Sequence, residues 1–174
     1  MTADSSLRLL IIDDHAVVRE GLEAMLGIDP CFEAIATAGS TEEALPYCEN
    51  FRPHVILLDL KMPGSDGFNA LEIIRQRWPE IRVIILSASA TAAEVKLARR
   101  NGAAGYLGKS SDRATLLKAI RNAAAGATVF PIDPAPHRPA APPSAPANWK
   151  SCATSAAGYP ASNSAASSAS AAKP

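Results

Sequence analysis

The sequence contains little cysteine and no long apolar segment, and these two features exclude several classes of protein. Its three cysteines, Cys31, Cys48 and Cys152, share no metal-type spacing and have no histidine cluster nearby, so we expect neither a disulfide framework nor a zinc site. No apolar run approaches the roughly 20 residues that cross a bilayer. The first residues, MTADSSLR, lack a charged segment followed by an apolar one, so we expect no secretory signal and a cytoplasmic protein.

An excess of charge of one sign is also absent. The 174 residues carry 17 Lys and Arg against 17 Asp and Glu, and residues 1–130 carry 14 basic and 16 acidic side chains, a formal charge of −2. Nonspecific binding to nucleic acid or to an anionic membrane depends on a basic surface. We therefore expect neither kind of binding from residues 1–130.

The last quarter of the chain lacks large apolar side chains. Of residues 131–174, 31 of 44 are Ala, Pro or Ser, and Ile132 is the only Ile, Leu, Val or Phe. Such a segment buries too little apolar surface to offset its conformational entropy. The sequence therefore predicts one folded domain over residues 6–127 and a disordered low-complexity tail over residues 128–174.

The rest of the sequence shows a regular alternation of two patterns. Short apolar runs alternate with longer stretches in which apolar residues recur at helical spacing. The runs are Leu7–Ile12, Phe32–Ala38, Val55–Leu58, Ile81–Leu86 and Ala103–Leu107. The first, third and fourth are apolar nearly throughout, which is typical of parallel strands buried on both faces. The alternation predicts an α/β fold, with a doubly wound five-stranded parallel sheet and five helices.

Local signals mark the helices between these runs. Ser40–Glu43 resembles a capping box, and Ser110–Asp112 offers N-cap residues before the last helix. Pro46 falls inside the second helix or near its start, which leaves that boundary open. The expected apolar face of the first helix consists of Val17, Val18, Leu22, Met25 and Leu26.

Polar residues follow the predicted strands. Asp13 and Asp14 follow the first run, Asp59 the third, Ser87 the fourth and Lys109 the fifth. Taken singly, each has an ordinary structural explanation as a helix cap, a turn residue, a small strand-end residue or a solvated lysine. In a doubly wound sheet, however, the functional crevice lies beyond the carboxyl ends of the strands. As a set, these residues therefore favour a single site there.

The chemistry of this set points to phosphoryl transfer. Converging carboxylates repel one another unless a cation lies between them. Ligand sets of oxygen alone favour Mg²⁺, completed by water and a substrate phosphate. Asp59 would then be a nucleophile that forms an aspartyl phosphate. Lys109 and the metal would offset charge on the phosphoryl oxygens, and the Ser87 hydroxyl would hydrogen-bond one of them.

Four stretches carry a family resemblance: IIDDHAVVREGL, VILLDLKMPGSDGF, VIILSAS and GAAGYLGKS. The spacings between successive site residues also suit this family: 45 residues from Asp14 to Asp59, 28 from Asp59 to Ser87, and 22 from Ser87 to Lys109. Residues 6 to about 126 resemble the receiver domain of bacterial two-component response regulators, nearest the LuxR/FixJ-type subgroup. The resemblance implies a flavodoxin-like sheet with strand order 2-1-3-4-5.

The resemblance also implies roles for particular residues. Asp59 would be the phosphoacceptor, charged from a phosphohistidine on a partner sensor histidine kinase. Its carboxylate is then expected to be exposed to the phosphodonor. Asp13, Asp14, Asp59 and the backbone carbonyl of Lys61 would organise the Mg²⁺ site. His15, directly after the acidic pair, is interpreted as a solvated or helix-start histidine rather than a ligand.

A conformational switch is implied as well. Ser87 would be the switch hydroxyl and Tyr106 the aromatic that turns inward with it, although Tyr106 is equally explained as a tyrosine at the edge of the core. The fourth helix, fifth strand and fifth helix would form the output face, with homodimerisation through it. Gly108 departs from the family pattern, because a larger apolar residue is usual there.

Members of this subgroup usually carry a helix-turn-helix domain after a linker, and here it is missing or out of frame. In a shifted reading frame, the codons of Asn148-Trp149-Lys150 necessarily encode Leu-Glu. Synonymous codons around them permit Leu-Ser-Pro-Arg-Gln-Leu-Glu-Val-Leu-Arg, and residues 167–174 permit Leu-Gly-Ile-Ser-Gly-Lys-Thr. Both strings resemble the LuxR-type DNA-binding domain, so we hypothesise a frameshift near residues 131–143, which the coding DNA would test.

Three functions therefore stay open at this point. The leading one is a phosphorylatable receiver, which is a signalling module rather than a turnover enzyme and catalyses only its own phosphorylation and dephosphorylation. The second is a DNA-binding transcriptional regulator, for which this chain shows no recognition helix. The third is an interaction module that keeps the pocket without being phosphorylated.

Overall fold

The computed structural model describes residues 6–62 and 65–130. Its five helices are α1 (Ala16–Gly27), α2 (Thr41–Asn50), α3 (Gly67–Arg77), α4 (Ala92–Arg100) and α5 (Arg113–Ala124). Its main strands are β1 (Leu7–Ile12), β2 (Phe32–Ala38), β3 (Val55–Asp59), β6 (Arg82–Ser87) and β7 (Gly105–Gly108). Among the described residues, no helix is long and apolar enough to cross a membrane.

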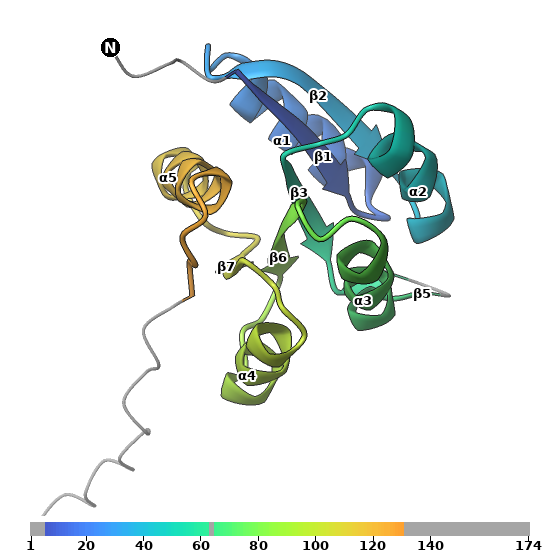
Figure 1. The fold of residues 1–174 in the computed structure, drawn as a ribbon. Coiled ribbons are helices and arrows are strands. Elements are labelled where there is room, and N and C mark those ends of the chain that lie inside the picture. Colours follow the sequence, from blue (N-terminus) through green and yellow to red (C-terminus); the bar gives the residue numbers. More distant parts are fainter. Residues whose placement is uncertain (1–5, 63–64, 131–174) are drawn as a thin grey trace, which may run out of the picture. The chain divides into compact units, whose positions relative to one another are not determined.

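The main strands form one parallel sheet in the order β2-β1-β3-β6-β7 (Figure 1). This confirms the expected five-stranded, doubly wound sheet and its order, with β6 and β7 as the fourth and fifth predicted strands. The order reverses after β2, so that β1 and β3 lie side by side at the centre. Because all five strands run the same way, their carboxyl ends share one edge of the sheet.

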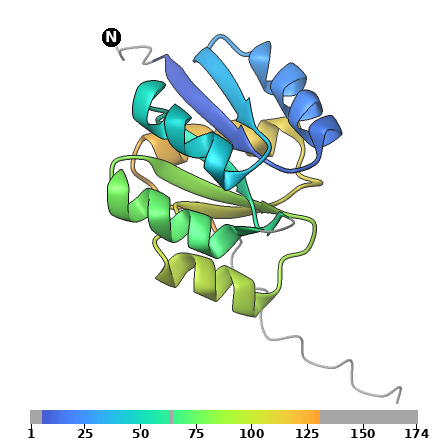
Figure 2. The ribbon, with the colours of Figure 1, turned by 90° about the vertical axis from the view of Figure 1, so that its right-hand side faces the viewer.

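The helices cover both faces of the sheet and bury two apolar cores (Figure 2). One core includes Ala44 and Cys48 of α2, Leu71 of α3 and Ala98 of α4. The other joins α1 and α5 through residues such as Leu26. Alternate residues of β1, β3 and β6 point into one core and then the other, which explains why these strands are apolar nearly throughout.

The helix ends follow the predicted signals with small differences. The Ser40 hydroxyl accepts the backbone N–H of Glu43, as in a capping box, but the Glu43 carboxylate accepts the N–H of Gly39 at 2.6 Å. Asp112 is the N-cap of α5. Pro46 lies inside α2, which settles the boundary that the sequence left open.

Val17 departs from the predicted apolar face of α1. Its side chain is 82% exposed, whereas Leu22 and Leu26 are buried. Val17 stands in the first turn of the helix, ahead of the buried residues of its apolar face. The apolar spacing in the sequence therefore includes one residue that is not buried.

Two small pairings were not anticipated. Lys61–Met62 (β4) and Ser65–Asp66 (β5) form an antiparallel pair directly after β3. Val129 forms a parallel bridge to Gly105, with its N–H donating to the Ala104 carbonyl at 2.7 Å and its carbonyl accepting from Tyr106 at 2.9 Å. Segments of one or two residues carry no periodicity, so sequence patterns do not reveal them.

The chain after α5 stays in contact with the fold up to the last described residue. Phe130 packs against the core on the α2–α4 face, and the guanidinium carbon of Arg99 lies 4.6 Å from its ring centre. The domain boundary at 127/128 stays a prediction. The disordered tail and the frameshift hypothesis concern residues 131–174, which lie outside the described residues.

Candidate functional site

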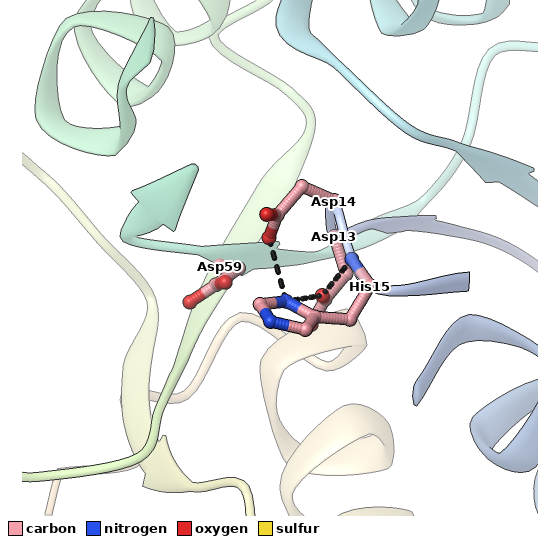
Figure 3. Close-up of side chains that lie close together, drawn as sticks. All are labelled: Asp13, Asp14, His15 and Asp59. Atoms are coloured by element: carbon pink, nitrogen blue, oxygen red, sulfur yellow. Dashed lines mark hydrogen bonds and ion pairs between the residues drawn. The ribbon is translucent and has the colours of Figure 1, made fainter. Parts of the chain in front are cut away.

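The sheet brings the sequence-predicted residues to one edge. Asp13 follows β1, Asp59 ends β3, Ser87 ends β6 and Lys109 follows β7. Since β1, β3, β6 and β7 are consecutive in the sheet, their carboxyl ends present these residues side by side. Figure 3 shows Asp59 facing the loop that carries Asp13, Asp14 and His15.

Lys109 joins the two buried carboxylates. Its Nζ lies 2.6 Å from Oδ2 of Asp13 and 2.8 Å from Oδ2 of Asp59. Burial alone would lower the pKa of Lys109, but its hydrogen bonds to Asp13 and Asp59 and their negative charges outweigh that penalty, so the pKa is raised. The backbone N–H of Lys109 donates to the Ser87 carbonyl at 2.8 Å, which fixes the loop after Gly108.

Hydrogen bonds to the Asp13 side chain, to Arg19 and to β2 hold the loop between β1 and α1. Asp13 Oδ1 accepts the N–H of His15 at 2.9 Å, and the Arg19 guanidinium donates to the Asp13 carbonyl. The N–H of Asp13 donates to Ala38 of β2 at 3.2 Å. These bonds hold the Asp13 carboxylate in place. Arg19 was not predicted as a site residue, although it lies on the first helix four positions after His15.

Asp59 lies deep in the site. Its exposed fraction is 3%, lower than the exposure we expected of a residue that a phosphodonor reaches. Its Oδ1 accepts the backbone N–H of Lys61 at 3.2 Å. The backbone beside it is tightly packed, because a Cβ on Gly67 would lie 2.6 Å from Leu60 Cα and 2.7 Å from the Asp59 carbonyl. Gly67 is thus a positioning residue that sequence reasoning overlooked, although it stands in the quoted DGF motif.

Asp14 and His15 form the outer part of the site. The His15 side chain is 63% exposed and His15 is the N-cap of α1, as expected of a helix-start histidine. Its Nδ1 also lies 2.8 Å from Asp14 Oδ1. Potential ligand atoms of Asp13, Asp14, His15 and Asp59 all lie within 4.8 Å of one another (Figure 3).

Ser87 and Tyr106 occupy the far side of the site. Both are fully buried. The Tyr106 hydroxyl donates to the Ser89 carbonyl at 3.1 Å, and its oxygen lies 3.4 Å from Oε2 of Glu94. Burial raises the pKa of Tyr106, and the neighbouring Glu94 and Asp59 add to this, while a hydrogen bond with Ser87 opposes it. Tyr106 therefore points inward in this structure.

The site fits a divalent cation. Three carboxylates and one lysine carry −3 and +1, which leaves −2 for a cation to neutralise. Asp13 Oδ2 is buried, and the Lys109 ammonium, 2.6 Å away, is its close counter-charge. Oxygen donors with this charge are the chemistry that Mg²⁺ prefers.

Comparison with known proteins decides the family. The family model of the response regulator receiver domain matches residues 9–121, which contain all of the site residues above. The chain belongs to this family. The transcriptional regulatory protein DegU of Brevibacillus brevis is 35% identical over 123 residues, covering 71% of this chain and 52% of DegU.

Other relatives place the receiver domain among LuxR- and NarL-type response regulators. The nitrate/nitrite response regulator protein NarL of Escherichia coli K12 is 34% identical over 130 residues, covering 75% of this chain and 60% of NarL. The crystal structure of a LuxR-family two-component response regulator from Aurantimonas has a TM-score of 0.68 at 34% identity, covering 72% of this chain and 89% of that one.

These matches confirm the resemblance seen in the sequence. Receiver domains are signalling modules of two-component systems rather than turnover enzymes; they bind Mg²⁺ at an acidic pocket and interact with histidine kinases. The chain spans between about half and three fifths of the length of the two curated relatives.

Proposed function

We propose that this receiver domain accepts a phosphoryl group on Asp59 from a phosphohistidine of a sensor histidine kinase. The observation that carries the proposal is Lys109 Nζ, which lies within 2.8 Å of Asp59 Oδ2 and 2.6 Å of Asp13 Oδ2. A lysine that bridges two buried carboxylates from separate strands is positioned to stabilise extra negative charge there.

The proposed step is a displacement at phosphorus. An oxygen of the Asp59 carboxylate forms a bond to phosphorus while the P–N bond to the kinase imidazole breaks, and the imidazole nitrogen leaves with the electron pair and takes up a proton. Lys109 offsets charge on the phosphoryl oxygens. Hydrolysis by water later returns the carboxylate, so the domain catalyses only its own phosphorylation and dephosphorylation.

Asp13, Asp14, Asp59 and the backbone carbonyl of Lys61 would hold Mg²⁺. The metal would neutralise the carboxylates and draw the phosphoryl oxygens toward them. Asp14 and His15 form the outer part of the site, so an incoming donor meets them before it reaches the buried Asp59 carboxylate.

Ser87 and Tyr106 would report the new charge. The Ser87 hydroxyl now accepts the N–H of Ser89 at 3.4 Å, a weak contact that a phosphoryl oxygen can replace. Movement of Ser87 would shift the Ser89 carbonyl, which accepts a hydrogen bond from the Tyr106 hydroxyl. The resulting change would reach the α4–β7–α5 face, where we place phosphorylation-linked homodimerisation in the cytoplasm.

Acetyl phosphate with Mg²⁺ tests the proposal. Wild type should gain the mass of one phosphoryl group, and Asp59→Asn should gain none. Asp112→Asn is the matched control, because Asn caps a helix as well as Asp does, and it should be labelled like wild type. An unlabelled wild type would favour the phosphorylation-independent interaction module, and a labelled Asp59→Asn would place the phosphoacceptor elsewhere.

A further inference from the structure

The loop between β1 and α1 places a nitrogen donor among the oxygens of the site, and phosphoryl transfer does not require it. His15 Nδ1 lies 2.8 Å from Oδ1 of Asp14 and 3.4 Å from Oδ1 of Asp13. Figure 3 shows the imidazole ring among the three carboxylates, with dashed lines to Asp13 and Asp14. The ring belongs to the same cluster, in which one ligand atom of each of the four residues lies within 4.8 Å of the others.

The 2.8 Å contact between His15 and Asp14 is a hydrogen bond, and both separations also match those of neighbouring ligands on one metal ion. Ligands at adjacent corners of an octahedron, each about 2.1 Å from the metal, are about 3.0 Å apart. The observed 2.8 and 3.4 Å lie on either side of that value. Small side-chain rotations would therefore bring Nδ1 and both oxygens onto one cation.

The lysine does not contact these atoms, although Asp13 Oδ1 also accepts the backbone N–H of His15 at 2.9 Å. Lys109 contacts Oδ2 of Asp13 and Oδ2 of Asp59, whereas the atoms near His15 are the Oδ1 atoms of Asp13 and Asp14. The ammonium and a cation on the His15 side thus use different oxygens of Asp13. The ring is 63% exposed, so it can turn without disturbing the core.

We propose that His15, which the sequence alone favoured as a helix-start histidine rather than a ligand, is a nitrogen ligand that shifts the metal preference of this site toward first-row transition ions, with Co²⁺ as the probe. Imidazole is a favoured ligand of such ions, whereas Mg²⁺ binds oxygen and retains water. The assignment rests on the proposed function, because both use the same metal site.

The experiment compares the binding of Co²⁺ and of Mg²⁺, each alone, to wild type, His15→Asn and His137→Asn. Asn removes the imidazole yet remains a good N-cap residue, so α1 should keep its stability. His137→Asn removes a histidine from the sequence outside the described residues and controls for adventitious Co²⁺ binding. The readouts are isothermal titration and the paramagnetically shifted imidazole N–H signal of the Co²⁺ complex in proton NMR.

Loss of His15 should weaken Co²⁺ binding by about 10-fold or more and leave Mg²⁺ binding within about twofold. The shifted imidazole signal should disappear in His15→Asn and persist in His137→Asn. Equal affinities in wild type and His15→Asn, or an equal loss for both metals, would overturn the role of His15. A wild type that binds Co²⁺ through His15 but not Mg²⁺ would instead contradict the Mg²⁺ part of the proposed function, and one that binds neither would overturn both.

Discussion

At the scale of single residues, the site depends on charge balance in a buried place. Lys109 is the counter-charge of Asp13 and Asp59, which are both almost fully buried. Burying a carboxylate without a partner costs far more than the net gain from a surface ion pair. Removing the lysine should therefore destabilise the fold, whereas a bound cation should relieve the repulsion that remains between the carboxylates.

Replacing Lys109 by Met should lower the free energy of unfolding by about 2 kcal/mol in the presence of EDTA. Saturating Mg²⁺ should recover part of this loss, because the metal takes over the neutralisation of the carboxylates. Urea denaturation with and without Mg²⁺ measures both effects. Lys118→Met, on the exposed side of α5, serves as the control and should have little effect in either condition. A Lys109→Met protein as stable as wild type in EDTA would contradict this account.

Sequence reasoning located the residues of the site but not their contacts. Asp13, Asp59, Ser87 and Lys109 were predictable because each stands at the end of a buried strand. The Lys109 bridge, and the bond from Arg19 to the Asp13 carbonyl, depend on side-chain positions across neighbouring strands. No spacing in the sequence encodes such positions.

At the scale of elements, close backbone approach decides where glycine is needed. A Cβ on Gly105 of β7 would lie 2.6 Å from the Val129 carbonyl oxygen, whereas a Cβ on Gly21 of α1 would meet nothing within 4 Å. The same substitution should therefore have opposite effects at the two positions.

Gly105→Ala should weaken the pairing of Val129 with β7 and cost about 1–2 kcal/mol, since two backbone hydrogen bonds depend on it. Gly21→Ala should stabilise the protein by about 0.5–1 kcal/mol through helix propensity. Denaturation gives both values, and hydrogen exchange at the Val129 N–H should speed up only in Gly105→Ala. Unchanged protection of Val129 in that variant would show that the edge accommodates a methyl group.

The capping box of α4 gives a pH-dependent contribution. The backbone and side chain of Thr91 donate to Glu94, and these hydrogen bonds lower the pKa of Glu94 below 4.5. A lowered folded pKa means that the stabilisation is present above pH 4.5 and is lost as the pH falls through the folded value. Relative to Glu94→Gln, wild type should be more stable at pH 7 by up to about 1 kcal/mol.

This difference should shrink steadily as the pH falls below about 4.5. Urea titrations between neutral and acidic pH measure it, with Glu49→Gln on the exposed face of α2 as the control. A difference that stays constant down to acidic pH would mean that Glu94 does not titrate through this cap.

The elements themselves were largely predictable. The predicted strands agree with β1, β2, β3, β6 and β7 within two residues. The pattern is clearest for β1, β3 and β6, because parallel strands covered on both faces are apolar nearly throughout. The β4–β5 pair was missed because two-residue strands carry no pattern, although Pro63-Gly64 between them is a turn signal in the sequence.

At the scale of the whole molecule, the last described residues matter to the domain. Phe130 packs on one core and meets Arg99, and Val129 pairs with β7. Composition placed the end of the domain near residue 127, because a change in composition is seen only over many residues. The contacts of Val129 and Phe130 depend on the surfaces that these two residues pack against, which composition does not show.

A chain ending at Phe130 should be as stable as the full 174-residue chain and be phosphorylated equally well. A chain ending at Ala127 should lose about 2 kcal/mol, because it lacks the packing of Phe130 and both hydrogen bonds of Val129. Thermal and urea denaturation of the three lengths measure this. Equal stability of the two shortened chains would show that residues 128–130 add nothing to the fold.

The bridge at Val129 also determines how mechanical load enters the domain. Any cargo fused after Phe130 would pull first on the rim of the sheet, next to Tyr106, rather than on the end of α5. A tethered reporter at that position would therefore pull on the edge strand that carries Tyr106. A reporter attached ahead of Leu7 would instead pull on the amino end of β1, an interior strand.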